Sequence, residues 1–422
     1  MDESAQRRKG VVWNAVGSAL FAANTLVMVV VVSRTSSVAA VGCFGIALAV
    51  AQLLYLVGLF GVNLFQMTDY KRQYAFADYA KARMLTCLLM ALACVPLVAW
   101  GMAEPEKRLF TALLVAFFLT HAFGDLYQSL LFREDRLDLS GQALAFRVGA
   151  ALLAFVVVQA LTASIGLALA ASTLASLLGI LLWGARWARP YHRGLPGARP
   201  GAARALLKEC LPLFVASFLV LLVFNAPRYG IDYLMDDEAQ GYFSMIVLPA
   251  LVINLISQFV FNPALSSIAR ALRDADRRGF HRLVAQKAAV VVAMTALVAL
   301  AMPPLGIPLL TLLYAVDLGG FPLEASLLIV GGGLFALNQL LYSVLVIMRR
   351  QKGILLAYSI GAAAAAAMTV LAIVGLGLTG ACVAFVLSQV PVLVLFGIMV
   401  LVGTRRLGAE GAGDAEGGAR AS

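Results

Sequence analysis

Two ionisable residues stand inside long apolar stretches of the sequence. Asp125 falls in the apolar segment 109–132, and Arg147 falls in the next one, 139–160. A charge inside hydrocarbon is costly, so such residues are functional candidates by default. If the two segments form an antiparallel helical hairpin, each charge lies roughly 10–12 Å from the same end. The pattern therefore predicts an Asp125–Arg147 ion pair that either fixes helix packing or takes part in substrate binding or ion coupling.

Two further arginines follow apolar segments at matching places. Arg34 comes after segment 11–33, and Arg228 comes after segment 206–226. A long side chain in such a position reaches readily to the membrane interface. The alternative is that both guanidinium groups face a cleft and hold an anionic headgroup, because their planar fork matches phosphate oxygens.

Other polar residues extend this candidate set. Asn14, Asn24, Asn225 and Asn254 lie within apolar segments, where an amide either lines a polar groove or bonds to a neighbouring helix. Asp69 lies in the polar break after the second segment. It is interpreted as a solvated carboxylate or, together with Asp125, as a candidate for coupling.

The sequence offers no pattern typical of enzyme catalysis. It has no Ser/His/Asp, Cys/His or phosphate-loop constellation in a proper context. Five cysteines lie in or beside apolar stretches without CxxC or His-rich spacing, which favours small buried side chains over metal ligands. We therefore expect no catalytic residues, no metal and no cofactor, and leave open whether H⁺ or Na⁺ drives any transport.

The amino-acid composition indicates that much of the chain is surrounded by lipid rather than water. Of its 422 residues, 62% are hydrophobic and 13% are charged, against about 45–50% and about 25% in ordinary soluble domains. A soluble fold of this size could not hide so much apolar surface. These values exclude a soluble globular enzyme, a disordered chain and a secreted disulfide scaffold.

Apolar windows long enough to cross a bilayer, about 20 residues each, recur twelve times. They are placed at 11–33, 38–62, 83–102, 109–132, 139–160, 163–185, 206–226, 240–263, 284–302, 323–348, 353–374 and 380–403. The Pro-rich stretch 303–317 is interpreted as an extension of the ninth helix or a re-entrant piece. The predicted fold is an all-α integral membrane protein with 12 transmembrane helices in two six-helix lobes.

The cationic residues fall almost entirely on one side of this topology. Of the 32 Lys and Arg residues, 27 lie in the termini and even-numbered breaks, 4 lie in the odd-numbered breaks, and Arg147 lies within a helix. Cytoplasmic loops carry such an excess, so both termini are expected in the cytoplasm. The net charge of +10 suits anionic lipid headgroups and requires no nucleic acid.

The halves of the chain share a weak repeat. Ser33-Arg34 and Gly42-Cys43-Phe44 in the first half match Pro227-Arg228 and Gly241-Tyr242-Phe243 in the second. We predict an N-terminal lobe over 1–185, a basic cytoplasmic linker over 186–205, a C-terminal lobe over 206–404 and a disordered tail over 405–422. Six helices per half give both copies the same orientation, which places a substrate between them near mid-membrane.

These motifs carry a resemblance to a known family. Asn14-Ala-Val-Gly17-Ser18, Gln66-Met-Thr68-Asp69, Asn225-Ala-Pro227-Arg228-Tyr229-Gly-Ile231 and Asn262-Pro263-Ala-Leu265 resemble segments of bacterial polysaccharide biosynthesis flippases. These are lipid-linked oligosaccharide (O-antigen-type) flippases of the multidrug/oligosaccharidyl-lipid/polysaccharide exporter superfamily. The resemblance covers about residues 10–405.

The resemblance implies a pair of six-helix lobes around a cationic cavity, in the cytoplasmic membrane of a bacterium. Its implied cargo is an undecaprenyl-diphosphate-linked saccharide, moved from the inner to the outer leaflet by alternating access. Arg34 and Arg228 match the family's arginine positions, and Asn14, Asn225 and Tyr229 lie in the same motifs and join them as candidate substrate contacts. Membrane lipids, a polysaccharide polymerase and glycosyltransferases are the expected partners. The chain lacks the two extra helices of lipid II flippases, which favours exopolysaccharide or O-antigen units.

Two other functions remain open from sequence. A cation-coupled drug or metabolite antiporter of the same superfamily would share the architecture, but it would be expected to carry a carboxylate cluster, and Asp125 is the clearest buried acid. An integral-membrane polysaccharide polymerase or ligase would need a long external loop with catalytic Arg or His, whereas the external breaks are short.

Overall fold

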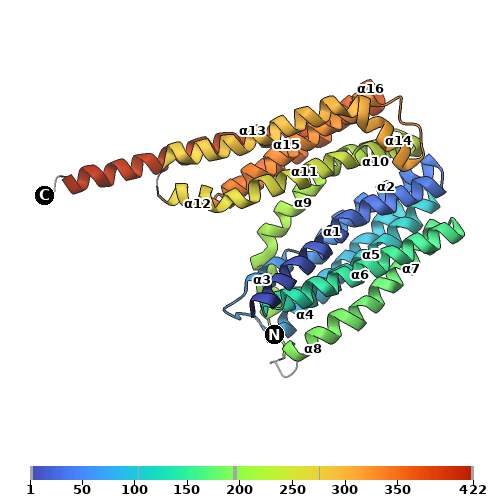
Figure 1. The fold of residues 1–422 in the computed structure, drawn as a ribbon, viewed down its shortest axis with the longest axis horizontal. Coiled ribbons are helices and arrows are strands. Elements are labelled where there is room, and N and C mark those ends of the chain that lie inside the picture. Colours follow the sequence, from blue (N-terminus) through green and yellow to red (C-terminus); the bar gives the residue numbers. More distant parts are fainter. Residues whose placement is uncertain (1–2, 103, 193–196, 275, 420–422) are drawn as a thin grey trace. The chain divides into compact units, whose positions relative to one another are not determined.

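The computed structural model describes residues 3–102, 104–192, 197–274 and 276–419, with side chains described from residue 8 to residue 404 within those ranges. These residues form helices and no strands. The chain divides into two compact units, Met1–Phe218 and Leu219–Ser422, and each is described by itself (Figure 1).

Unit 1 contains the first nine helical elements and the start of the next. They are α1 (Glu3–Thr35), α2 (Val38–Leu59), α3 (Val62–Thr68), α4 (Phe76–Trp100), α5 (Pro105–Arg133), α6 (Leu137–Thr162), α7 (Ile165–Gly179), the π-helix η1 (Ile180–Ala185), α8 (Arg186–His192) and the first part of α9 (Ala202–Leu234).

Local sequence signals determine where several of these helices begin. Ser37 and Ser164 accept hydrogen bonds from backbone amides at the beginnings of α2 and α7, as N-caps do. Pro105 opens α5, where its missing amide costs nothing.

Unit 2 contains the rest of α9 and the remaining elements. They are α10 (Asp237–Ile246), α11 (Leu248–Phe261), the 3₁₀ turn η2 (Asn262–Ala264), α12 (Leu265–Arg273), α13 (Arg277–Ala301), the π-helix η3 (Met302–Gly306), α14 (Ile307–Tyr314), α15 (Pro322–Ile347) and α16 (Gln351–Ala419). Gly377 interrupts α16 with φ 57° and ψ −132°, a conformation suited to a residue without a side chain.

The described residues include 11 helices long and apolar enough to cross a membrane, the last being Gln351–Thr404. Because Gly377 divides that 54-residue stretch, it supplies two spans. The predicted multi-pass, all-helical fold with twelve spans is therefore confirmed. Residues 302–314 continue α13 as η3 and α14, so this segment extends the ninth span.

Two predicted helix boundaries were wrong in ways that affect the site. The third span begins at Phe76 rather than at residue 83, and the seventh ends at Leu234 rather than at residue 226. Polar residues at the ends of these helices kept them outside the apolar windows. Their backbones continue as helix because a helix satisfies every amide and carbonyl internally.

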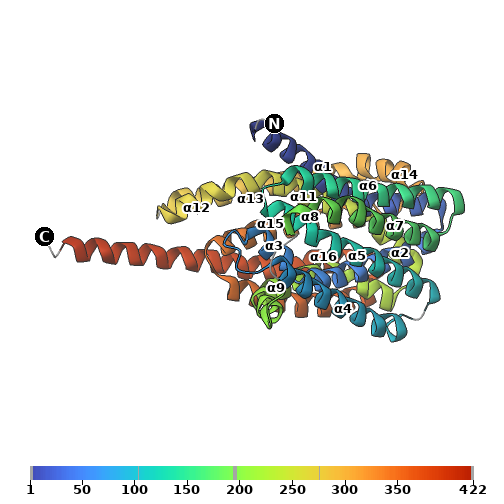
Figure 2. The same cartoon turned by 90° about the horizontal axis from the view of Figure 1, so that it is seen from below.

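Close helix contacts in unit 1 depend on glycine. α1 and α6 run side by side in Figure 1 and Figure 2, and they form the most extensive helix pair of the unit. A Cβ built on Gly141 of α6 would lie 2.3 Å from the backbone nitrogen of Asn14 on α1. Small residues allow such close approach in membranes, where packing replaces the hydrophobic driving force.

Unit 2 repeats this arrangement. α9 packs against the first part of α16, where a Cβ on Gly230 would lie 2.2 Å from Cγ2 of Thr369. α1 and α9 each contain 33 residues, and α4 and α13 each contain 25. α2 packs on α5 in unit 1, and α11 packs on α15 in unit 2. The same helix order and the same pairings support the internal repeat predicted from sequence.

The predicted lobe boundaries differ from the division of the structure. The sequence places the division in the linker 186–205, whereas the structure divides within α9, after Phe218. Residues 186–192 of this linker form α8, and residues 193–196 lie outside the described residues. α16 continues to Ala419 where a disordered tail was expected from residue 405. Elongating an existing helix avoids the nucleation cost.

Candidate functional site

A buried ion pair joins α4 and α5 in unit 1. Arg83 is fully buried, and its Nη2 lies 3.1 Å from Oδ2 of Asp125, whose side chain is 14% exposed. This corrects the predicted pairing of Asp125 with Arg147. The sequence places Arg83 at the very start of the third apolar window, 83–102, but α4 begins at Phe76 and carries Arg83 two turns into the helix.

The same guanidinium group caps the end of α2. The carbonyl of Gly58 lies in the last turn of this helix, where carbonyls lack helical partners. It accepts hydrogen bonds from Nη1 of Arg83 at 2.6 Å and from Oγ1 of Thr86 at 2.7 Å. The next two residues, Phe60 and Gly61, have positive φ values and interrupt the path of the chain. A cation is favourable at a helix C-terminus, so Arg83 stabilises this break within the membrane-spanning region.

Arg147 is also buried, but it bonds to backbone. Its Nη1 donates to the carbonyls of Thr120 and His121 at 3.2 and 3.3 Å. The guanidinium fits because α5 has a glycine at this point, since a Cβ on Gly124 would lie 1.5 Å from Nη1 of Arg147. The charges of both Arg83 and Arg147 act on Asp125, so the three side chains form one electrostatic group.

Arg147 also lines a small cavity inside unit 1. Gly124, Gln128, Gly179 and Gly184 contribute to its wall. Gly184 belongs to the π-helix η1, an irregularity frequent at functional sites. The buried guanidinium of Arg147 therefore lies beside three glycines, Gly124, Gly179 and Gly184, at this cavity.

Asn225 and Arg228 come together on α9 in unit 2. Arg228 is 5% exposed, and its Nη1 donates to Oδ1 of Asn225 at 3.1 Å. The amide nitrogen of Asn225 donates to the carbonyl of Leu221 at 3.2 Å. Nε of Arg228 is buried without a hydrogen-bond partner. The adjacent Tyr229 is half-buried, so this turn of α9 holds three of the predicted candidates.

Arg34 and Asn14 lie on α1 in unit 1. Arg34 is exposed in the last turn of the helix, and Asn14 is half-buried against Gly141. The expected equivalence of Arg34 and Arg228 therefore extends to their helices but not to their burial. α9 continues past Arg228 to Leu234, whereas α1 ends one residue after Arg34. Asn24 is buried on α1, and its amide contacts the sulfur of Met28.

Asp69 organises the loop between α3 and α4. Its carboxylate accepts hydrogen bonds from the amides of Gln73 and Tyr74 at 2.9 and 3.2 Å, and from the hydroxyl of Tyr79 at 2.8 Å. With 5% exposure, it is not the solvated carboxylate expected from sequence. Three hydrogen-bond donors satisfy the carboxylate locally. Asp69 therefore holds the conformation of this loop.

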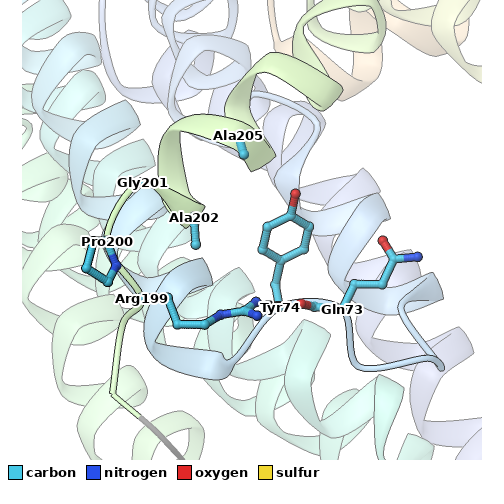
Figure 3. Close-up of a pocket in the computed structure, with 7 residues that line it drawn as sticks. All are labelled: Gln73, Tyr74, Arg199, Pro200, Gly201, Ala202 and Ala205. Carbon is cyan, nitrogen blue, oxygen red and sulfur yellow. Dashed lines mark hydrogen bonds between the residues drawn. The ribbon is translucent and has the colours of Figure 1, made fainter.

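A pocket lies where this loop meets the start of α9 (Figure 3). Arg199 donates to Asp78, with its backbone nitrogen 2.8 Å from Oδ1, and to the carbonyl of Gln73 at 2.5 Å. The hydroxyl of Tyr74 donates to Glu209 at 3.0 Å. Burial, and then the hydrogen bond to Glu209, raise the pKa of Tyr74. These contacts anchor the beginning of α9 to unit 1.

Sequence reasoning missed Arg83, Thr86 and Gly58. One signal was available for Arg83, because Asp78 stands three residues after Ala75 and accepts a hydrogen bond from its amide at 3.0 Å. An acidic residue at this third position is typical of a helix start. It would have placed Arg83 two turns inside the helix instead of at its first residue. No comparable signal marks the Gly58 carbonyl as an acceptor.

Comparisons with known proteins agree with this architecture. A sequence model described as "Polysaccharide biosynthesis protein" matches residues 8–269. No match was found among curated proteins. Among solved structures, the lipid II flippase MurJ in an inward closed conformation is similar at a TM-score of 0.72, with 12% identity over 94% of this chain and 90% of that one.

Two other solved structures have similar folds. An inward-facing multidrug resistance MATE family transporter of the MOP superfamily has a TM-score of 0.69, with 14% identity over 92% of this chain and 95% of that one. A MOP superfamily transporter from Pyrococcus furiosus has a TM-score of 0.56, with 14% identity over 96% of both chains. Identities this low describe the fold. Because the family model covers more than half of the sequence, this multi-pass membrane protein belongs to the polysaccharide biosynthesis protein family and has the fold of MOP-superfamily transporters.

Proposed function

We propose that the protein is a flippase, and not an enzyme, that moves a polyprenyl-diphosphate-linked oligosaccharide from the inner to the outer leaflet during polysaccharide biosynthesis. The observation that carries this proposal is the buried guanidinium of Arg228 on α9, with its unpartnered Nε. Membership of the polysaccharide biosynthesis protein family supports a saccharide precursor as the cargo class.

Charge balance explains why this arrangement suits a diphosphate. A buried cation without a counter-ion is costly in a membrane protein. A diphosphate supplies the missing negative charge and accepts several hydrogen bonds from one guanidinium group. Asn225 holds Nη1 of Arg228 at 3.1 Å and leaves its other donors for the cargo. Cargo binding would then shift the equilibrium between inward-open and outward-open states.

The remaining candidates take supporting roles in this proposal. Arg34 supplies a second cation, Asn14 and Tyr229 contribute polar contacts to the saccharide, and the polyprenyl tail stays in the bilayer. The excess of Lys and Arg in the even-numbered breaks supports a topology with both termini in the cytoplasm, and the proposed cargo assigns the protein to the inner membrane of a bacterium. A polysaccharide polymerase and glycosyltransferases would act on either side of this transport step.

The main alternative is a cation-coupled drug or metabolite antiporter. It would use a carboxylate that is free to exchange its cation, and Asp125 is the buried acid it would need. The 3.1 Å contact between Asp125 and Arg83 disfavours that use, since the carboxylate is already neutralised. An integral-membrane polymerase or ligase is disfavoured by the short external breaks.

Reconstitution into liposomes tests the proposal. A fluorescent polyprenyl-diphosphate saccharide is added, and its exchange between leaflets is measured for wild type, Arg228→Ala and Arg34→Ala. Arg278→Ala, at an exposed arginine of α13, is the matched control. We expect a loss of at least about tenfold in Arg228→Ala, equivalent to about 1.4 kcal/mol, a smaller loss in Arg34→Ala and none in the control.

Two results would contradict this assignment. Equal exchange rates in wild type, Arg228→Ala and Arg34→Ala would remove the arginines from cargo binding. An absence of exchange with any polyprenyl donor, combined with ion-driven export of a cationic dye, would favour the antiporter.

A further inference from the structure

Two oxygen atoms contact the guanidinium of Arg83 inside unit 1, and the hydroxyl of Thr86 bonds to one of them. The carbonyl of Gly58 lies 2.6 Å from Nη1, and Oδ2 of Asp125 lies 3.1 Å from Nη2. Oγ1 of Thr86 lies 2.7 Å from the Gly58 carbonyl oxygen. Gly58, Arg83 and Thr86 are all buried. A carbonyl and a carboxylate therefore contact one positive charge, and a hydroxyl lies beside the carbonyl.

This donor set is the kind that binds a small hard cation. Hard cations take oxygen ligands, including carboxylates and backbone carbonyls. In transporters with interrupted helices, the carbonyls at the exposed helix end contribute to such sites. α2 is interrupted directly after Leu59, where Phe60 adopts φ 50° and Gly61 adopts φ 72°. The Gly58 carbonyl is therefore available to a cation, and here the cation is a side chain.

We infer that Arg83 acts as a tethered cation in a site otherwise suited to a monovalent metal ion of the Na⁺ class. The guanidinium group neutralises Asp125 and caps α2 without drawing an ion from solution. The wild-type protein consequently needs no dissolved cation at this position. Removing the guanidinium while keeping the oxygen ligands opens the site to Na⁺.

The neighbouring charges set the expected strength of that binding. Arg147 also acts electrostatically on Asp125, and its positive charge disfavours a second cation. Sodium binding in Arg83→Ala is therefore expected to be weak and to saturate only at high NaCl concentration.

A purely structural ion pair gives a different expectation. In that case Arg83→Ala would be destabilised, but NaCl and choline chloride at equal concentration would affect it equally. A tethered cation predicts a difference between the two salts. This difference is independent of the proposed flippase activity, because it is measured as stability of the cargo-free protein.

The experiment follows thermal unfolding of the full-length protein in lipid nanodiscs, with NaCl or choline chloride at matched ionic strength. We expect the Tm of Arg83→Ala to be several degrees higher in NaCl, and the wild type to show equal Tm values in both salts. Low millimolar guanidinium chloride is expected to raise the Tm of Arg83→Ala as well. Arg83→Lys should behave as wild type, because its ammonium group again supplies the charge.

A double variant identifies the ligands. Arg83→Ala/Asp125→Asn keeps the space but removes the carboxylate, so the sodium effect should disappear. Equal Tm values of Arg83→Ala in both salts, or an equal sodium effect in the wild type, would overturn the inference. If Arg83→Ala unfolds on extraction, its recovery as monodisperse protein is compared after solubilisation in NaCl and in choline chloride. Equal recovery in both salts would also overturn it.

Discussion

The two units share their helix order but differ in the chemistry of their interiors. Arg147 stands ten residues after the start of α6, and Gly361 stands ten residues after the start of α16. The residues that these two positions contact differ in the reverse way, a glycine in unit 1 and a larger residue in unit 2. Arg147 packs against Gly179, whereas Gly361 packs against Val392. Each unit places one bulky residue and one glycine at this contact, so the repeat keeps the packed volume while it changes the polarity.

A second pair of positions shows the same difference. His121 of α5 and Asn338 of α15 each stand 16 residues after the proline that opens their helix. The carbonyl of His121 accepts from the buried cation Arg147. Asn338 donates instead to the backbone and side-chain oxygens of Gln389, at 3.1 and 3.3 Å. Unit 1 therefore carries charge where unit 2 has neutral amides, and replacing charged groups should cost more than replacing amides.

The largest effect is expected at the charged contact of unit 1. Asp125→Ala leaves Arg83 buried without its counter-charge, which costs about 3–5 kcal/mol. A large fall in Tm should follow. Arg83→Met/Asp125→Leu removes both charges and should recover most of this loss. If the double variant were less stable than Asp125→Ala, the charge-pair explanation would be wrong.

The next largest effect is expected where the guanidinium of Arg147 packs against Gly124. Gly124→Ala places a methyl group 1.5 Å from the present position of Nη1, so the guanidinium must leave the carbonyls of Thr120 and His121. We expect a loss of about 2–3 kcal/mol from overpacking and broken hydrogen bonds. Gly149→Ala on α6 is the control, because no atom lies within 4 Å of its Cβ. Equal unfolding temperatures for the two variants would show that Arg147 is not held in this way.

The matching glycine of unit 2 should be less sensitive. A Cβ on Gly361 would lie 2.4 Å from Cγ2 of Val392, a clash with a side chain that carries no charge. Gly361→Ala is expected to cost about 1–2 kcal/mol. Adding Val392→Ala should restore part of the stability, as measured by thermal unfolding. A double variant with the additive loss of both single changes would argue against this contact.

The smallest effect of the comparison is expected at the neutral contact of unit 2. Asn338→Ala removes two hydrogen bonds to Gln389. Interhelical hydrogen bonds in membrane proteins contribute about 0.6 kcal/mol on average, so its Tm should fall by a small amount. A loss as large as that of Asp125→Ala would remove the distinction between the charged and the neutral unit.

A pH dependence is expected at the loop that anchors α9 to unit 1. The pKa of Tyr74 is raised from its ordinary value of 10.0 by burial and by the hydrogen bond to Glu209. A raised folded-state pKa means that this contribution is fully present below about pH 10 and is lost as the pH rises through the folded value. Tyr74→Phe should match the wild type in its pH profile up to pH 9 and lose less stability above pH 10. Identical alkaline profiles would exclude a role for this hydroxyl.

Much of the fold followed from sequence because its signals are local. Segments of about 20 apolar residues need no tertiary information to be recognised as spans. The expected break between residues 374 and 380 falls at Gly377. The predicted pairing of Asp125 with Arg147 was wrong because it also relied on these local windows. An apolar window omits the polar first turns of a helix. Starting α4 at residue 83 instead of Phe76 placed the true partner, Arg83, at the very end of the span.

By itself the sequence determined the twelve spans, the repeat and the residue types that carry charge into the bilayer. Hydrophobicity and helix periodicity act over neighbouring residues, so these features are fixed along the chain. Only the tertiary structure decided that Arg83 bonds to Gly58 and Asp125, and that Arg147 fits against Gly124. Such contacts depend on the rotation and depth of four helices, α2, α4, α5 and α6, which no short stretch of sequence specifies.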